Sequence, residues 1–398
     1  MTKTERLFFH FLRNGLWGDG SAPGVPVDAG DWEAVFRLSC RQAVSGIVAD
    51  GIAATAVRPA PGLWEEWVFH LLHIEMVNEG MERRGDSLVG FLASEGIRSS
   101  VFKGVSVARW YPRPLHRSYG DIDIVVHEGW NKLERLLQVN GVPYYHEDGD
   151  IVVERLDRLP LASGTVPGDK SAGTFGGQYR VEFHPVYEAL YSPFMNARLQ
   201  RMASGTSAWW RDNVGEDHAP SETAEFYLAC LILHVRRHVL SYGIGMKQVC
   251  DVAVMLRRAG VDLARLEAML RHLGAWRFGR ALFGFIDAYL AVGTPQSGPS
   301  RADKTTALLY HVFMHDGYVL KSQRESMGVG TRHAPVRVAR NGWFWVKRGV
   351  RLFGLMPGEA FFFVLNKVAS RLKDLLKAAC CRPFHRAGRL DGRVLING

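Results

Sequence analysis

The most informative stretch of the chain is a polar and apolar alternation, Asp-Ile-Asp-Ile-Val-Val, at residues 121–126. A β-strand has a side-chain period of two, so Asp121 and Asp123 share one face while Ile122 and Ile124 share the other. The β-branched residues that complete the stretch are typical of a strand with a buried face. The pattern therefore predicts a strand that begins with two neighbouring carboxylates on its polar face.

Other short segments have strand-like patterns bounded by turn-forming residues. We predict further strands at residues 100–102, 142–146, 151–156 and 179–184. An Asp-Gly pair within residues 147–150 predicts a hairpin turn between the second and third of these strands. In the last strand Arg180, Glu182 and His184 alternate with apolar residues, so these three side chains share one face.

Most of the remaining chain places apolar residues at helical spacing. The predicted helices cover residues 5–13, 32–44, 64–92, 105–110, 130–139, 221–240, 246–256, 262–273, 276–291 and 302–315. The longest is either one helix or two stacked helices interrupted near residues 80–85. We expect an α+β fold, in which a small mixed β-sheet core is flanked by N-terminal and C-terminal helical regions. The boundaries that we predict give four regions, 1–96, 97–215, 216–330 and 331–398.

Asp121 and Asp123 are candidate metal ligands. Two carboxylates held side by side raise each other's pKa unless a cation lies between them, and hard oxygen ligands with room for phosphates suit Mg²⁺. The alternative is that Asp121 caps a turn and Asp123 is solvated, because an isolated Asp-x-Asp pattern is common by chance. Glu182 is the candidate third carboxylate, and His184, on the same face, is expected to orient it.

A glycine, Gly104, stands between the predicted strand at 100–102 and the predicted helix at 105–110. At such a position the backbone amides can approach a phosphate closely, and the helix N-terminus favours negative charge. Lys103 and Arg117 are the nearby cations that we expect to meet phosphate oxygens.

These residues resemble the uncharacterised nucleotidyltransferase family of the DNA polymerase β superfamily. The resemblance is carried by Lys103-Gly104, by Arg-x-x-Gly-Asp-Ile-Asp at 117–123 and by Glu-Phe-His at 182–184. The segment 233–251 is similar to the helical segment that follows the catalytic domain in that family. The resemblance extends over residues 30–260 and fades beyond them.

The resemblance implies that Asp121, Asp123 and Glu182 are the catalytic carboxylates, and that they hold two Mg²⁺ ions. It also implies a nucleotide-binding set around the phosphate-loop glycine. The members of that set are Lys103, Gly104, Ser106, Arg117 and Gly120. The superfamily usually places Ser or Gly directly after its glycine, whereas here Val105 follows and Ser106 comes one place late. This departure leaves the hydroxyl contact to the triphosphate open.

The function that the resemblance implies is transfer of a nucleoside monophosphate from a nucleoside triphosphate to an acceptor hydroxyl. The acceptor is left open between a small molecule, a sugar, a protein and RNA. A turn-rich segment at 163–177 is either a mobile loop that folds over a bound nucleotide or a surface insertion. The alternative function is a non-catalytic binding module of the same fold, whose basic tail contacts a membrane or nucleic acid.

The positive charge of the chain is concentrated in its C-terminal region. The formal net charge is +9, yet residues 331–398 contain fourteen Lys or Arg against three acidic residues. The first 330 residues therefore carry a net charge of −2, so the basic character does not belong to the catalytic region. Aromatic residues and cations alternate in this tail, and such helices bind anionic membranes or nucleic-acid phosphates. The alternative is a solvated basic face on helices that pack through their aromatic residues.

Five cysteines have neither the spacing of a metal site nor that of a disulfide framework. Charged residues interrupt the apolar residues near the N-terminus, and no apolar stretch reaches the length of a membrane span. We therefore expect a cytoplasmic protein, and the basic tail leaves open a peripheral contact with the membrane. His234 and His238 stand four apart on a predicted helix, with Asp251 further on. Zinc binding there is conceivable, but pairing with acidic neighbours or a place in the active-site wall is favoured.

Overall fold

The structure, a computed structural model, describes residues 1–156, 158–159, 179–205, 208–213, 223–241, 243–293, 303–316 and 334–380. Three predictions therefore lie outside the described residues. These are the loop at 163–177, the start of a helix at Ser221 and the part of the basic tail beyond residue 380.

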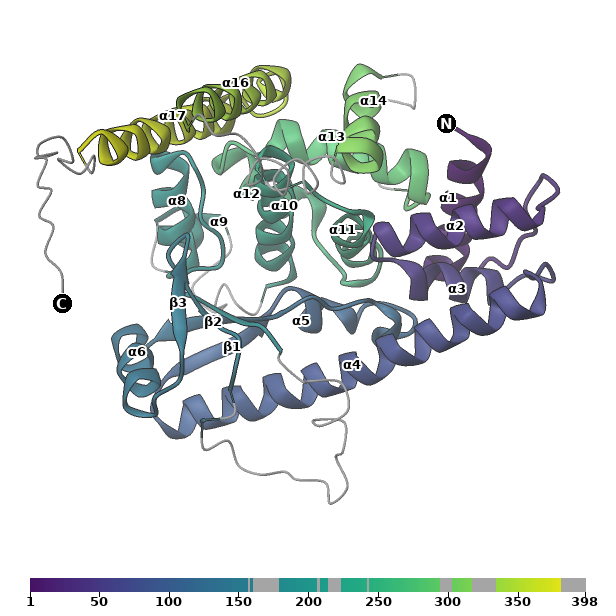
Figure 1. The fold of residues 1–398 in the computed structure, drawn as a ribbon, viewed down its shortest axis with the longest axis horizontal. Helices are drawn as coiled ribbons and strands as arrows, with labels where there is room; N and C mark the ends of the chain where they lie inside the picture. The colour runs from purple at the N-terminus through teal and green to yellow at the C-terminus, as the bar shows by residue number, and fades with distance from the viewer. Residues whose placement is uncertain are drawn as a thin grey trace, which may run out of the picture.

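Five short strands form one mixed sheet in the spatial order β1-β2-β5-β4-β3 (Figure 1). The strands are β1 Arg98–Phe102, β2 Ile122–Glu128, β3 Tyr144–Glu147, β4 Asp150–Val153 and β5 Val181–His184. β2 and β5 are parallel, whereas β1 pairs antiparallel with β2, and β4 pairs antiparallel with β3 and β5. The five predicted strands are thus all present, and the small mixed sheet is confirmed.

The predicted hairpin joins β3 to β4. Its two turn residues, Asp148 and Gly149, have φ of 52° and 99°. A type I′ turn needs positive φ at both central positions, which is why Asp-Gly suits it.

Helices α4 and α6 cover the apolar face of the sheet (Figure 1). Their bounds are α4 Pro61–Ser94 and α6 Trp130–Val139. Ile122 and Phe183 of the sheet share a buried core with Leu88 of α4 and Leu133 of α6. The opposite, polar face of the strands is turned toward the helices that follow the sheet in the chain.

The long helix α4 is continuous over 34 residues, so of the two predicted forms the single helix is confirmed. The two glycines near the predicted interruption, Gly80 and Gly85, allow close packing and do not break the helix. A Cβ on Gly80 would lie 2.2 Å from the hydroxyl oxygen of Tyr179, and one on Gly85 would touch Val101 of β1. Small residues here let the helix approach the sheet region closely.

The remaining helices pack on the other side of the sheet and at its end. Those before the sheet are α1 Lys3–Trp17, α2 Ala29–Arg41 and α3 Ser45–Ala53. Those after it are α8 Pro193–Ala203, α9 Ala208–Asn213, α10 Ala224–Leu240, α11 Met246–Arg258, α12 Leu263–His272, α13 Trp276–Leu290, α14 Lys304–His311, the π-helical turn η3 Val312–Asp316, α16 Ala334–Leu352 and α17 Pro357–Cys380. None of the helices in the described ranges is both long and apolar enough to cross a membrane.

One large hydrophobic core joins these helices to the sheet. It contains Leu12 of α1, Phe102 and Val125 of the sheet, Phe226 of α10 and Phe363 of α17. The predicted α+β class with flanking helical regions is confirmed. Because this core runs across the predicted boundaries, the division into four regions stays a prediction.

Helices α1 and α3 cross at a pair of glycines. A Cβ on Gly51 would lie 1.8 Å from the carbonyl oxygen of Phe11, and one on Gly15 would lie 1.8 Å from that of Ile47. Backbone oxygens cannot move aside as flexible side chains do. The crossing therefore requires glycine on both helices.

We predict that Gly51→Ala destabilises the fold, because the added methyl group forces the two helices apart. Overpacking of this kind costs about 1–3 kcal/mol. Gly90→Ala on α4 is the matched control, since its Cβ would meet nothing within 4 Å, and we expect it to be neutral or stabilising by up to about 1 kcal/mol. Denaturant unfolding measures both. Equal effects of the two substitutions would contradict the packing argument.

A buried histidine fixes the segment that leads into β2. His116 ends the short 3₁₀ helix η1, Pro114–His116, and its Nδ1 lies 2.8 Å from Asp50 of α3. Its Nε2 lies 2.6 Å from Glu75 of α4. Burial acts to lower the pKa of His116, but its hydrogen bonds and charge interactions with these two carboxylates outweigh burial and raise it. A charged His116 therefore joins two helices to the segment before Asp121.

We predict that this histidine stabilises the protein most at low pH. A raised pKa in the folded state gives a contribution that is complete below the ordinary histidine pKa of about 6.5 and is lost as pH rises through the folded value. The free energy of unfolding of the wild type should thus exceed that of His116→Gln by more at pH 6 than at pH 9. A difference that does not change with pH would contradict the charged state of His116.

Candidate active site

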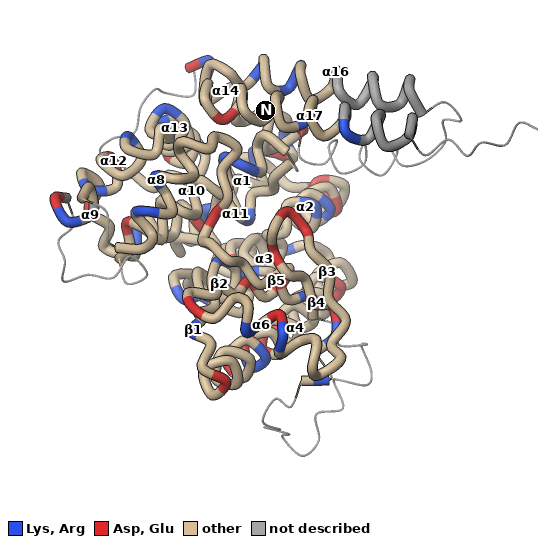
Figure 2. The backbone as a smooth tube through the Cα atoms, turned by 90° about the vertical axis from the view of Figure 1, so that its left-hand side faces the viewer, with Lys and Arg blue, Asp and Glu red and all other residues tan. Residues whose placement is uncertain are grey.

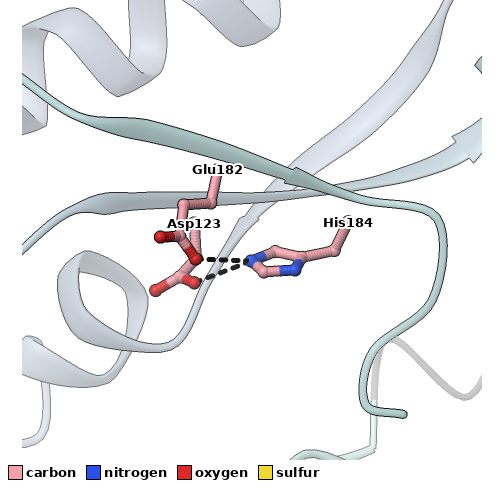
Figure 3. A group of neighbouring side chains, drawn as sticks. All are labelled: Asp123, Glu182 and His184. Carbon is pink, nitrogen blue, oxygen red and sulfur yellow. Dashed lines mark hydrogen bonds and ion pairs between the residues drawn. The ribbon is translucent and has the colours of Figure 1, made fainter. Parts of the chain in front are cut away.

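The parallel pairing of β2 and β5 brings acidic residues together. Its register places Asp123 directly beside Glu182, and His184 follows Glu182 on the same face. Asp121 stands immediately before β2, two residues ahead of Asp123. One possible ligand atom each from Asp123, Glu182 and His184 lie within 4.8 Å of one another (Figure 3).

His184 lies between two aspartates. Its Nε2 is 2.8 Å from Oδ1 of Asp123, and its Nδ1 is 3.0 Å from Oδ1 of Asp150 on the neighbouring strand β4. Burial and the charge of Lys103 act to lower the pKa of His184, but the hydrogen bonds to both aspartates raise it to about 9. His184 hydrogen bonds to Asp123, and its Nε2 also lies 4.0 Å from Oε2 of Glu182, within ion-pair distance (Figure 3). The orienting of Glu182 by His184 stays a prediction.

Lys103 is the second cation on Asp123. Its Nζ lies 3.0 Å from Oδ1 of that residue, at the point where β1 ends and the short helix α5, Gly104–Ala108, begins. Lys103 has φ 53° and ψ −126°, a backbone conformation that favours glycine. A lysine in this backbone conformation costs about 1–3 kcal/mol, and the contacts of the surrounding structure must offset that free energy.

The two aspartates of β2 differ in charge state. Although burial opposes ionisation, Lys103 and His184 hold the pKa of Asp123 well below its usual range. Asp121 receives no hydrogen bond or ion pair from the described residues, and burial and the carboxylates of Asp123 and Glu182 raise its pKa to about 6. Carboxylate oxygens left unpaired beside other carboxylates are the donor set of a hard cation site. These residues therefore fit a divalent ion.

A cleft of about 430 Å³ separates this face of the sheet from helices α10 and α11. This volume suits a small-molecule ligand. Polar and charged side chains make up most of its lining: Lys103, Asp121, Asp123, Glu147, Asp148, Asp150, Arg180, Glu182, His184, His234, Arg237, His238, Lys247 and Gln248.

A buried glutamate connects the cleft wall on α10 to the region after β5. Glu188 accepts hydrogen bonds from His234 Nδ1 at 2.9 Å and from Arg237 Nη1 at 3.0 Å. Burial acts to raise the pKa of Glu188, but its interactions with His234 and Arg237 hold it well below its usual range. Arg237 also pairs with Asp148 at the tip of the β3–β4 hairpin, at 3.2 Å. Helix α10 is thereby held across the sheet.

Lys247 faces the carboxylates from the opposite wall. It lies in the first turn of α11, and its Nζ is 3.4 Å from where a Cβ on Gly120 would stand, so this glycine leaves it room. No carboxylate among the described residues lies within ion-pair distance of Lys247. Burial and the charge of Arg117 lower its pKa, against the opposing charge of Asp121. An ammonium group thus points into the cleft and is available to an anion.

Arg117 makes an ion pair that the sequence did not predict. Its Nε and Nη2 donate to the two carboxylate oxygens of Asp251 on α11, at 2.8 and 2.5 Å, and both side chains are buried. A Cβ on Gly104 would lie 2.9 Å from Nη1 of Arg117. The glycine therefore makes room for an arginine that ties the sheet to α11. Arg117 also lines a second, smaller cavity of about 50 Å³ beside the carboxylates, together with Gly104 and Asp121. Its contact with a phosphate therefore stays a prediction.

Of the other predicted nucleotide-binding residues, Gly120 and Ser106 differ in whether they face the cleft. Gly120 lines the cleft, whereas Ser106 lies further into α5 and lines neither of the two cavities beside the carboxylates. The possible zinc ligands also separate. Asp251 is bound to Arg117 and accepts a hydrogen bond from Tyr111, while His234 is bound to Glu188. His234 thus pairs with an acidic neighbour, and both His234 and His238 line the cleft wall, which are the two roles favoured for these histidines.

Sequence reasoning missed several cleft residues. Lys247 lies within the segment 233–251 that carried part of the resemblance, and this was the available signal. Nothing in that segment indicated that Lys247 faces the carboxylates. Asp150 stood in a predicted turn, and only the β4–β5 pairing brings it to His184. Arg180, whose Nε is 2.6 Å from Glu182, shared a predicted face with that residue, and this was the available signal.

The comparisons with known proteins agree with this geometry. A family model described as an uncharacterised nucleotidyltransferase matches residues 28–291. Comparisons with curated proteins and with solved structures gave no match. The matched range spans more than half of the chain and includes every residue that lines the cleft. The chain therefore belongs to the uncharacterised nucleotidyltransferase family.

Proposed function

We propose that this protein is a Mg²⁺-dependent nucleotidyltransferase that moves a nucleoside monophosphate from a nucleoside triphosphate to an acceptor hydroxyl. The observation that carries the proposal is the register that sets Asp123 beside Glu182 in a cleft faced by Lys247. Family membership supports the reaction class. The carboxylates and the ammonium group together match a phosphate-bearing substrate with a divalent ion.

Asp121, Asp123 and Glu182 are the residues that would hold Mg²⁺. When bound, the ion supplies charge stabilisation to the attacking and leaving oxygens of a phosphoryl-transfer reaction. Lys103 keeps Asp123 ionised and in place, because its Nζ is already bound to that carboxylate. We therefore assign Lys103 to positioning the aspartate instead of to the triphosphate.

In the proposed reaction the acceptor oxygen bonds to the α-phosphorus, the bond to the β-phosphate oxygen breaks, and pyrophosphate leaves. The proton of the acceptor hydroxyl passes to Glu182. Arg180 occupies Oε1 of Glu182, so Oε2 is the atom that takes the proton. Lys247, across the cleft, neutralises the charge of the phosphates.

We predict that a double substitution, Asp121→Asn with Asp123→Asn, abolishes transfer of an α-labelled nucleotide to the protein itself or to an added acceptor. Losing several kcal/mol of transition-state stabilisation corresponds to a decrease of about 10²–10³-fold or more. Asp86→Asn, an exposed residue of α4, is the matched control and should leave activity unchanged. A chelator should remove activity, and added Mg²⁺ should restore it.

Two outcomes would contradict the proposal. Undiminished transfer by the double variant would remove Asp121 and Asp123 from the chemistry. Mg²⁺-dependent nucleotide binding in calorimetry without transfer by the wild type, across the acceptor classes tested, would favour the non-catalytic binding module.

We predict that Lys247→Ala weakens nucleotide binding, because the cleft loses its ammonium group from the helical wall. A charge-assisted contact contributes about 1.5–3 kcal/mol, so KM for the nucleotide should rise about tenfold or more. Lys247→Arg should restore part of the affinity, and Lys132→Ala, at an exposed position of α6, serves as the control. Steady-state kinetics with varied nucleotide measures this. An unchanged KM in Lys247→Ala would remove Lys247 from the binding site.

A further inference from the structure

Helices α16 and α17 form an antiparallel hairpin on the far side of α10 from the sheet (Figure 1). They cross closely at Gly349, where a Cβ would lie 2.3 Å from Val364 of α17. Trp345 of α16 and Phe363 of α17 pack at a ring distance of 5.6 Å, and Lys367 lies over both rings. The two helices therefore behave as one packed unit.

The inner face of the hairpin is fixed to the body by polar contacts. Arg348 of α16 donates to the carbonyl oxygens of Val239 and Leu240, at 2.9 and 3.0 Å, and so caps the C-terminus of α10. Glu359 of α17 accepts hydrogen bonds from the backbone amides of Tyr191 and Ser192, at 2.9 and 3.1 Å. These contacts determine which side of each helix faces outward.

The outer face exposes large apolar side chains on both helices. Residues four or seven apart on a helix share a face, so Trp343 lies in line with Val350 on α16, and Phe361 with Leu365 on α17. Their exposed fractions are 60%, 70%, 54% and 46%, in that order. On α16 the exposed Lys347 stands between Trp343 and Val350 in the same row. Helices α16 and α17 lie side by side at the edge of the molecule (Figure 2). Because Arg348 and Glu359 face the body, these exposed side chains lie on the side of each helix that faces away from it.

The apolar face continues onto α8. Phe194, 67% exposed, lies 6.0 Å from the ring of Phe362, which in turn lies 5.2 Å from Phe361. A contiguous patch of this kind on one side of a protein is characteristic of an interaction surface. We call Trp343, Val350, Phe361, Leu365 and Phe194 the outer apolar face.

Cations lie within and beside this face. Lys347 is exposed and lies 5.4 Å over the ring of Trp343, and Lys373 is exposed on α17. The segment 331–398 as a whole has fourteen cationic against three acidic residues. An apolar face bordered by Lys and Arg matches a bilayer with anionic headgroups, because side chains enter the acyl boundary while cations meet the headgroups.

We propose that the outer apolar face lies on the surface of an anionic lipid bilayer. Nucleic acid fits less well, because Val350 and Leu365 have no π-face on which a base can stack and would be left against water. A second copy of the chain fits less well too, since two copies of this strongly basic segment repel each other. Bound in this way, the protein keeps its cleft clear of the bilayer, because α10 lies between the hairpin and the sheet (Figure 1).

The test is sedimentation of the full-length protein with vesicles of phosphatidylcholine, alone or mixed with phosphatidylserine. We expect binding to the anionic vesicles that weakens as salt is raised, and weak binding to the neutral ones. The double variant Phe361→Ser, Leu365→Ser should bind anionic vesicles about tenfold or more weakly, because two apolar side chains no longer enter the interface. Circular dichroism and thermal unfolding verify that the variant keeps the fold.

Val139→Ser is the matched control, because Val139 is 86% exposed at the end of α6, away from the hairpin. It should bind as the wild type does. The proposal is overturned if the wild type ignores anionic vesicles, or if the double variant and the control bind alike. It is equally overturned if the double variant instead loses binding to a single-stranded RNA or loses dimerisation in size-exclusion chromatography, with vesicle binding unaffected.

Discussion

The parallel pairing of β2 with β5 is the constraint on which the candidate active site depends. On the polar face the register sets Asp123 beside Glu182, and on the other face it sets Ile124 beside Phe183, both with no exposed surface. A slip of one residue would exchange the two faces and bury the carboxylates in the apolar core. The hydrophobic contacts with α4 and α6 therefore enforce an arrangement of like charges that would be unfavourable by itself.

The unfavourable charge is offset by side chains from other strands. Lys103 and His184 both bind Asp123, and Asp150 holds the far nitrogen of His184. Lys103 reaches this position in a backbone conformation that favours glycine. Strain of this kind persists where the surrounding structure determines it, and it clusters at sites that act on ligands. In this protein it holds an ammonium group beside Asp123 where β1 ends.

The helical region completes the site instead of merely covering it. The Arg117–Asp251 pair locks α11 to the segment before β2, and this in turn brings Lys247 to face the carboxylates. Glu188 positions α10 through His234 and Arg237. Removing one partner of such a buried pair leaves an uncompensated charge, so these contacts specify the arrangement of sheet and helices strongly. Sheet and helices thus form one site.

The sequence by itself determined the strands, the hairpin turn, the helical remainder and the pairing of acidic positions on strand faces. Those features depend on side-chain period and turn chemistry, which are local. Only the tertiary structure decided what Arg117 and Gly104 do, because an ion pair with Asp251 and the space it needs join residues far apart in the chain. The same holds for Lys247: its place in the cleft follows from how α11 packs against the sheet, which no local pattern encodes.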